Sequence, residues 1–169
     1  MSTNSLICSI NSVLSKLLNQ RIRKINRVAN MLTLCFGDSV ICVNMKGNPV
    51  IKSKYSLHIQ CNWEITHGDR TLLSDEDFYV PMHKIHPRLV EDDDIGDSKF
   101  DELSLKFNAD IENNPITVIS FQANVIGGFH LALNNGVIIK VYPYDPSDGE
   151  SWRFLMPGTD EEHFVIFDE

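Results

Sequence analysis

The sequence predicts an α+β fold in which an N-terminal helix packs on a mainly antiparallel sheet, with a mid-chain excursion containing a second helix. Three observations support this prediction. The first residues have helical apolar spacing, a central segment alternates strictly between apolar and polar residues, and short branched segments separated by turns fill the last third. With 169 residues and no linker or internal repeat, the chain is expected to form a single domain over residues 1–169.

The first element is a helix expected from about Ser5 to Asn19. Its apolar residues recur at intervals of three and four, which places them in one stripe along the helix. Basic residues follow the stripe, where they favour the carboxyl end of the helix dipole. The stripe is therefore expected to pack on the sheet, and it consists of Leu6, Ile7, Ile10, Val13, Leu14, Leu17 and Leu18.

Strands are expected next, at residues 25–30, 31–36 and 39–44, with turns at 37–38 and 46–49. A longer strand from Tyr55 to Thr66 then alternates without exception. Its apolar face, expected in the core, comprises Leu57, Ile59, Cys61, Trp63 and Ile65. Its polar face comprises Ser56, His58, Gln60, Asn62, Glu64 and Thr66.

Residues 67–114 have weaker patterns, and we expect an irregular excursion that contains a helix from about Asp97 to Asn108. Ser98 is its expected N-cap. Its apolar stripe would comprise Phe100, Leu103 and Phe107.

Strand patterns return in the last third, where Asn135-Gly136 supplies the positive backbone φ of a tight hairpin. The expected strands are residues 116–123, 128–133, 137–142, 152–156 and 163–167.

Charge is unevenly distributed along the chain. Five basic residues and no acidic residue precede Asp38, whereas the rest of the chain has ten basic and 23 acidic residues. Because nucleic-acid binding depends on clustered Lys and Arg, this acidic body argues against nucleic acid as a partner. It suits a basic protein partner, through steering and charge complementarity. A homodimer stays open, and it would need an apolar patch left over after the core is formed.

We expect a soluble, cytoplasmic protein with no membrane partner. The apolar runs are shorter than the ~18 residues that a membrane span needs. Positive charge follows the first apolar segment, whereas a secretory signal carries it in front. The four cysteines show no paired spacing, and three of them, Cys35, Cys42 and Cys61, lie in apolar strand-like runs, which favours reduced thiols.

The polar face of the Tyr55–Thr66 strand is the first candidate binding site. A row of one imidazole, two amides and one carboxylate can hydrogen-bond a ligand or a partner strand; a solvated strand face is the alternative. The end residues are about 20 Å apart at ~3.3 Å per residue, so they cannot act as one acid–base pair. Cys61 points away from this row, so it has no imidazole partner there. The row is His58, Gln60, Asn62 and Glu64.

A second group of candidate binding residues lies near the end of the chain. Tyr142, Trp152 and Arg153 belong to the residue types enriched at binding hot spots. We expect them to lie together, with Tyr144, if the late strands pair. The alternative is a packed tryptophan beside an ion pair between Arg153 and Glu150.

No catalytic, cofactor or metal motif is present. The pair His83 and His86 is too small a ligand set for zinc. The acidic run Asp92–Asp97 fails the calcium-loop pattern, because Gly96 and Leu103 stand where oxygen ligands are needed. We expect no catalytic residue, no cofactor and no metal. The alternative is a small-molecule-binding protein or enzyme with a polar pocket around His58, Gln60 and Arg153.

Two blocks of the chain resemble those of small bacterial cytosolic proteins of unknown function, with an LHIQCxW strand and a late ExWRF strand. Here the blocks are residues 57–65 and residues 135–154. Some members of that group are encoded near polymorphic toxin systems, so the resemblance implies an immunity-like, toxin-binding role. It assigns no catalytic residue, and members usually carry Arg where this chain has Glu64.

Overall fold

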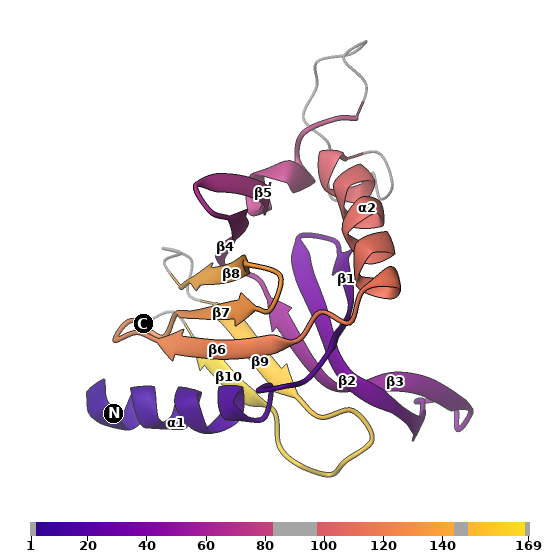
Figure 1. Ribbon diagram of the computed structural model, residues 1–169. Coiled ribbons are helices and arrows are strands. Elements are labelled where there is room, and N and C mark those ends of the chain that lie inside the picture. The colour runs from indigo at the N-terminus through magenta and orange to yellow at the C-terminus, as the bar shows by residue number, and fades with distance from the viewer. Residues whose placement is uncertain (1–2, 83–97, 144–148, 168–169) are drawn as a thin grey trace.

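A computed structural model describes residues 3–82, 98–143 and 149–167. The predicted α+β class is confirmed (Figure 1). His83, His86, Asp92–Asp97 and Tyr144 lie outside the described residues. The helices are α1 (Thr3–Ser15), the short 3₁₀ helix η1 (Asp75–Phe78) and α2 (Lys99–Asn113). The strands are β1 (Ile22–Val28), β2 (Met31–Val43), β3 (Pro49–Ile59), β4 (Asn62–His67), β5 (Arg70–Ser74), β6 (Val118–Ala123), β7 (Phe129–Leu133), β8 (Val137–Tyr142), β9 (Glu150–Leu155) and β10 (Phe164–Phe167).

The strands form two five-stranded sheets rather than the one sheet that we expected. Sheet 1 has the order β1-β2-β3-β9-β10, and sheet 2 has the order β5-β4-β8-β7-β6. Every pairing in both sheets is antiparallel. Sheet 1 thus draws its strands from both ends of the described chain, with β9 beside β3, whereas sheet 2 consists of the consecutive strands β4 to β8.

The predicted strand Tyr55–Thr66 passes from one sheet to the other. It breaks at Gln60 and Cys61, whose backbone amides both donate to the carbonyl of Ser151, at 2.8 and 3.1 Å. The residues before the break belong to β3 in sheet 1 and those after it to β4 in sheet 2. The apolar face predicted for this segment is buried throughout, from Leu57 to Ile65. Two members of the predicted polar face, Ser56 and Thr66, are buried as well.

The core lies between the two sheets. Trp152 of sheet 1 packs edge-on against Phe129 of sheet 2, with ring centroids 4.9 Å apart. A second group of aromatic residues packs in the same core, where Trp63 contacts Phe78 and Phe100. One cluster of buried side chains therefore spans both sheets and both long helices.

Helix α1 lies along β6, the edge strand of sheet 2 (Figure 1). Its buried residues Ile10 and Leu14 belong to the predicted stripe. The helix ends at Ser15, four residues before the predicted end, and Leu17 is buried in the turn that follows. This turn is tied to β6, because the amide of Asn19 donates to the carbonyl of Val118.

Helix α2 covers the outer edge of sheet 1. The predicted N-cap is confirmed, since the Ser98 side chain accepts from the Asp101 amide. The Asn108 side chain donates to the carbonyl of Ile25 in β1 and accepts from its amide, both at 2.8 Å. Asn108 thus takes the place of a further strand and closes this edge of the sheet.

A single strand, β2, replaces the two that we expected at residues 31–36 and 39–44. The predicted turn at Gly37 and Asp38 is instead a register irregularity between Phe36 and Ser39. Gly37 has φ +79°, a backbone conformation that other residues rarely adopt, and an added Cβ would lie 3.0 Å from the Gln20 side chain, so glycine is favoured there. Beyond this point β2 and β3 continue as a two-stranded hairpin, residues 39–53, which we call the arm (Figure 1).

Candidate functional site

The predicted polar row is divided between the two sheets. Its first half joins residues of β9 on sheet 1, in a group that we call the His58 cluster: His58, Gln60, Glu150 and Arg153. Its second half joins residues of β7 and β8 on sheet 2, in a group that we call the Glu64 cluster: Glu64, His130, Lys140 and Tyr142. Asn62, opposite Tyr142 in the ladder, is exposed.

Glu150 is the centre of the His58 cluster. Its carboxylate accepts from Arg153 Nε at 2.6 Å and also from a terminal guanidinium nitrogen of Arg153. Gln60 Nε2 donates to the same carboxylate at 3.1 Å. His58 is the cross-strand neighbour of Arg153. Three of the predicted binding residues, His58, Gln60 and Arg153, therefore do lie together.

The charges of this cluster are mutually stabilised. Hydrogen bonding from Arg153 lowers the pKa of the Glu150 carboxyl, and hydrogen bonding to Glu150 raises the pKa of the Arg153 guanidinium. Burial lowers the pKa of the His58 imidazole, and the nearby Arg153 lowers it further. His58 is consequently neutral at neutral pH, with an acceptor nitrogen available for a partner's donor.

An acidic loop leads to the His58 cluster along the chain. The loop between β9 and β10 exposes three consecutive acids, Asp160, Glu161 and Glu162. His163, the next residue, is near enough to His58 to influence its pKa. Glu161 forms an exposed ion pair with Lys16, at 3.3 Å. The loop thus exposes three acids within three residues of His163, near a cluster whose own charges cancel.

The side chains of the Glu64 cluster also hydrogen-bond to one another. Glu64 Oε1 accepts from Lys140 Nζ at 2.8 Å and from the Tyr142 hydroxyl at 2.9 Å. The His130 ring stands edge-on to the Tyr142 ring, with centroids 6.2 Å apart. The Lys140 hydrogen bond lowers the pKa of Glu64, and burial, followed by the hydrogen bond to Glu64, raises the pKa of Tyr142 to about 12. Tyr142 is therefore a donor and not a base at neutral pH.

Trp152, one of the predicted binding residues, is a core residue in the structure. We expected it beside Tyr142 if the late strands pair, as a candidate binding residue, but its side chain is fully buried. Its indole Nε1 donates to the carbonyl of Gly127 at 2.9 Å. Tyr142 lies in sheet 2 and Arg153 in sheet 1, so the expected grouping of the late strands is wrong. The alternative, a packed tryptophan beside an Arg153–Glu150 ion pair, is confirmed.

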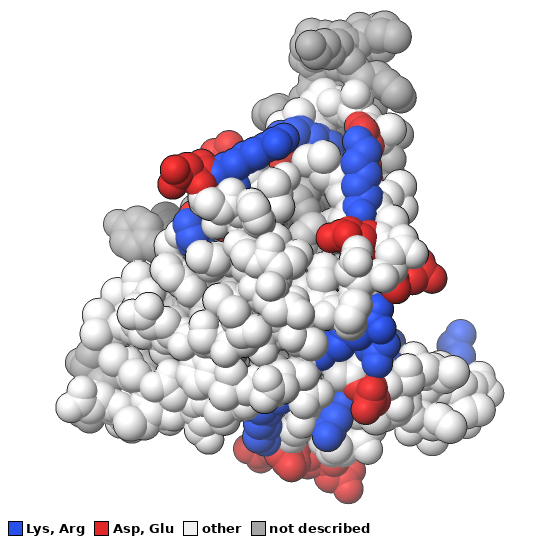
Figure 2. Space-filling model, viewed as in Figure 1, with Lys and Arg blue, Asp and Glu red and all other residues white. Residues whose placement is uncertain are grey.

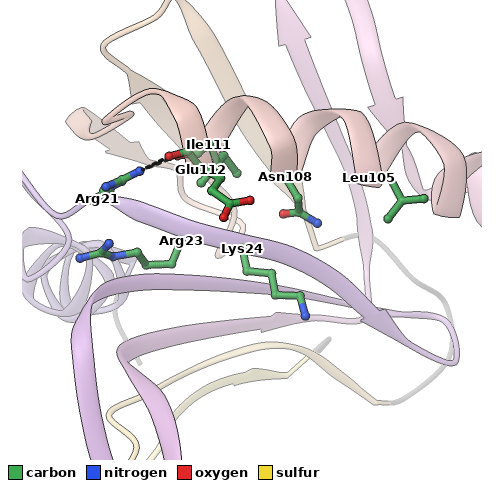
Figure 3. A pocket seen from close by; sticks show the side chains of 7 residues that line it. All are labelled: Arg21, Arg23, Lys24, Leu105, Asn108, Ile111 and Glu112. Carbon is green, nitrogen blue, oxygen red and sulfur yellow. Dashed lines mark hydrogen bonds between the residues drawn. The ribbon is translucent and has the colours of Figure 1, made fainter.

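A groove of about 440 Å³ lies elsewhere, between β1 and the carboxyl end of α2 (Figure 3). Arg21 donates from one terminal nitrogen to the carbonyls of Ile111 and Glu112, at 2.7 and 3.0 Å, and so caps the helix. Arg23 bonds Asp38 and the carbonyl of Gly37. Sequence reasoning missed this groove, although the acid-free basic block was visible. Its lining comprises Arg21, Arg23, Lys24, Leu105, Asn108, Ile111 and Glu112.

Charged side chains are unevenly spread over the surface. Figure 2 shows a broad uncharged area over α1, β6 and β7, with basic and acidic groups gathered around it. None of these three elements contains a charged residue. Among the described residues, no group of three or more His, Cys, Asp or Glu side chains could hold a metal ion. No helix in the described part of the chain is long and apolar enough to cross a membrane.

Comparisons with known proteins gave no match: no family model, no curated protein and no solved structure is similar to this chain.

Proposed function

We propose that this chain is a non-enzymatic cytoplasmic protein-binding module whose partner is a basic protein, in the manner of an immunity protein that holds a basic toxin. The observation that carries the proposal is the acidic loop 160–162, which leads to the His58 cluster through His163. Its three carboxylates are exposed, and His163 acts on the His58 imidazole, which lies with Gln60 on a polar strand face. Such a surface suits a partner that supplies Lys, Arg and amide donors.

The charge of the whole chain supports the same kind of partner. The formal net charge is −8, which steers a basic protein toward the surface and repels nucleic acid and anionic membranes. Within both clusters the carboxylate is already bonded to a cation. The exposed loop acids Asp160 and Glu162 have no cation bonded to them in the described structure, so they are available to a partner.

Charge reversal tests the proposal. The chain would be immobilised, incubated with lysate of its source cell and washed with increasing salt, and the retained proteins identified by mass spectrometry. A basic protein should be retained near physiological salt and released by about 1 M salt, where screening is short-ranged. The variant D160K/E162K should lose it. The control D69K/E76K reverses two exposed acids on other elements and should keep it. Equal binding by both variants would contradict the proposal.

The second candidate is a small-molecule site at the His58 cluster. It is favoured by one observation, which is that Gln60 and Arg153 converge on Glu150 beside a neutral imidazole. A fragment library would be added to the ¹⁵N-labelled chain while the amide resonances of β3 and β9 are followed. Saturable shifts confined to these strands would support a ligand site. Shifts spread over the surface, or none, would count against it.

A further inference from the structure

The arm carries the most exposed apolar side chains of the described chain. Ile41, Val43 and Ile51 expose 78, 72 and 74% of their surface, and Met45 at the tip is fully exposed. Ile, Val and Met normally lie in the core. A set of them gathered on one projecting hairpin therefore marks a contact surface.

These side chains gather on one face of the arm. Ile41 pairs with Ile51 and Val43 pairs with Pro49, and partners in a ladder point to the same side. The intervening pairs, Val40 with Lys52 and Cys42 with Val50, point to the opposite side. The free face consists of Ser39, Ile41, Val43, Pro49, Ile51 and Ser53, and it holds no charged residue.

The opposite face is partly covered by this chain itself. Gly158, in the loop between β9 and β10, lies so close that an added Cβ would be 2.9 Å from the Cys42 sulfur. Val40, Cys42 and Val50 are accordingly only half-exposed. The β9–β10 loop thus covers one side of the arm and leaves the Ile41 side uncovered.

The free face continues the core-facing side of sheet 1. Along β3, alternation places Ile51 on the same side as the buried residues Tyr55, Leu57 and Ile59. Sheet 2 covers the apolar side of the strand over those three residues, but it does not cover Ile51, which is 74% exposed. The strands are also uncovered at their edges, because β1 reaches only Phe36 and β9 reaches only Ser56. In the described part of the chain, no third strand flanks the arm.

We propose that a second copy of this chain covers the free face, so that two arms pack face to face about a twofold axis. A twofold axis matches a surface to itself, and a charge-free apolar face can do so without like-charge repulsion. We place this axis perpendicular to the arms, so that they are antiparallel and the tip of each arm meets the base of the other. The tip holds Lys46, and the base holds Asp38, which bonds Arg23 of its own copy but keeps 92% of its side chain exposed, so its carboxylate can also face Lys46 of the other copy at both ends. This inference goes beyond the proposed function and uses a different surface.

Two other occupants fit less well. An anionic membrane would meet the arm together with a body of net charge −8, which opposes approach. A basic protein would be steered by the acidic residues of the body, and the arm has none: from residue 39 to residue 53 its charged residues are Lys46 and Lys52.

Sedimentation velocity of the full chain, from about 1 µM to about 500 µM, tests the dimer. The wild type should shift from monomer to dimer, and I41K/I51K should stay monomeric with its circular dichroism unchanged. The control I119K places a lysine on the uncharged face at β6, where Ile119 is 55% exposed, and should still dimerise. A wild type that is monomeric throughout overturns the proposal. So does a dimer that is lost in I119K and kept in I41K/I51K.

Two further measurements do not depend on the apolar variant. K46E and D38K should each weaken the dimer by about 5-fold, and K46E/D38K should restore it, since the charges exchange places. In a mixture of labelled and unlabelled chains, isotope-filtered NOEs should join Ile41 methyls of one copy to Ile51 methyls of the other. Absence of these NOEs in a sample that is dimeric overturns the arm-to-arm arrangement. Loss of the basic partner in D160K/E162K with the dimer intact would separate this inference from the proposed function.

Discussion

Arg27 and Asp101 form a two-point ion pair that joins β1 to helix α2. Arg27 Nε and a terminal nitrogen donate to the two Asp101 oxygens at 3.1 and 3.0 Å, and the guanidinium is almost completely buried. The same carboxylate accepts from the Ser98 amide and hydroxyl, so it also completes the N-cap of α2. A single side chain therefore holds both the start of the helix and its position on the sheet.

The first prediction is that D101N destabilises the fold by about 3 kcal/mol, because it removes the negative charge that faces a buried guanidinium. Chemical denaturation measures this. The matched control is K106Q, also on α2, which loses an exposed pair with Glu102 and should cost less than about 0.5 kcal/mol. Similar losses in both variants would show that the buried ion pair contributes no more to the free energy of unfolding than the exposed one.

The second prediction concerns Trp152. W152F removes the hydrogen bond to the Gly127 carbonyl and leaves a void beside Phe129, so unfolding free energy should fall by about 1–3 kcal/mol. Urea titration followed by far-ultraviolet circular dichroism checks the loss. If Trp152 were a binding residue, the variant would instead keep its stability and lose its partner.

The third prediction is that the His58 pKa is below 6.5 and that its two charged neighbours move it in opposite directions. R153Q should raise it, because a cation is removed, and E150Q should lower it, because an anion is removed. NMR titration of the imidazole Cε1–H resonance measures both. Since the folded-state pKa is the lower one, stability from this group is complete above pH 6.5 and is lost as pH falls through the folded pKa. Shifts of one sign in both variants would contradict the arrangement.

The fourth prediction concerns Tyr142, whose pKa is raised from 10.0 to about 12. Its phenol should ionise at a higher pH than an ordinary tyrosine, and E64Q should lower the pKa of this phenol because it removes the carboxylate. Ultraviolet absorbance of the phenolate follows this, and Y142F identifies the signal. Because the folded-state pKa is the higher one, stability from this group is complete below pH 10 and is lost as pH rises toward 12.

The fifth prediction compares two glycines. An added Cβ at Gly128 would lie 2.5 Å from the Val141 carbonyl oxygen, whereas at Gly47 it meets nothing within 4 Å. G128A should therefore cost more than about 2 kcal/mol through overpacking. G47A should cost about 1 kcal/mol, from its positive φ alone. Thermal melts rank the two, and a smaller loss for G128A would contradict the close approach of β7 and β8.

The sequence predicted what short-range alternation determines. Alternate residues from Leu57 to Ile65 face the core, and Ser98 caps α2. Both were predictable because a strand period and a cap each depend on a few neighbouring residues. The break at Gln60 was not predictable in this way. It depends on the carbonyl of Ser151, a long-range partner that no local pattern identifies. β5 was missed because Arg70–Ser74 is short and half polar.

The candidate site was predicted in part for the same reason. Residue type identified His58, Gln60 and Arg153, and the β3–β9 pairing does bring them together. Residue type does not show how deeply a side chain is buried, so Trp152 was named a candidate binding residue although it is fully buried and β9 is an inner strand of sheet 1. The division of the row between two sheets likewise depends on the register of Glu64 with Lys140, which are 76 residues apart.

The pairing of β3 with β9 has a consequence for biosynthesis. Gln60 and Glu150 are 90 residues apart, so β3 emerges from the ribosome well before the strand that covers its edge. At ~5–20 residues per second, that edge waits on the order of 5–20 s for its neighbour. An uncovered strand edge is a template for aggregation during that time. Slower translation of residues 60–150 should therefore lower the yield of folded protein, and a chaperone that shields nascent strands should restore it.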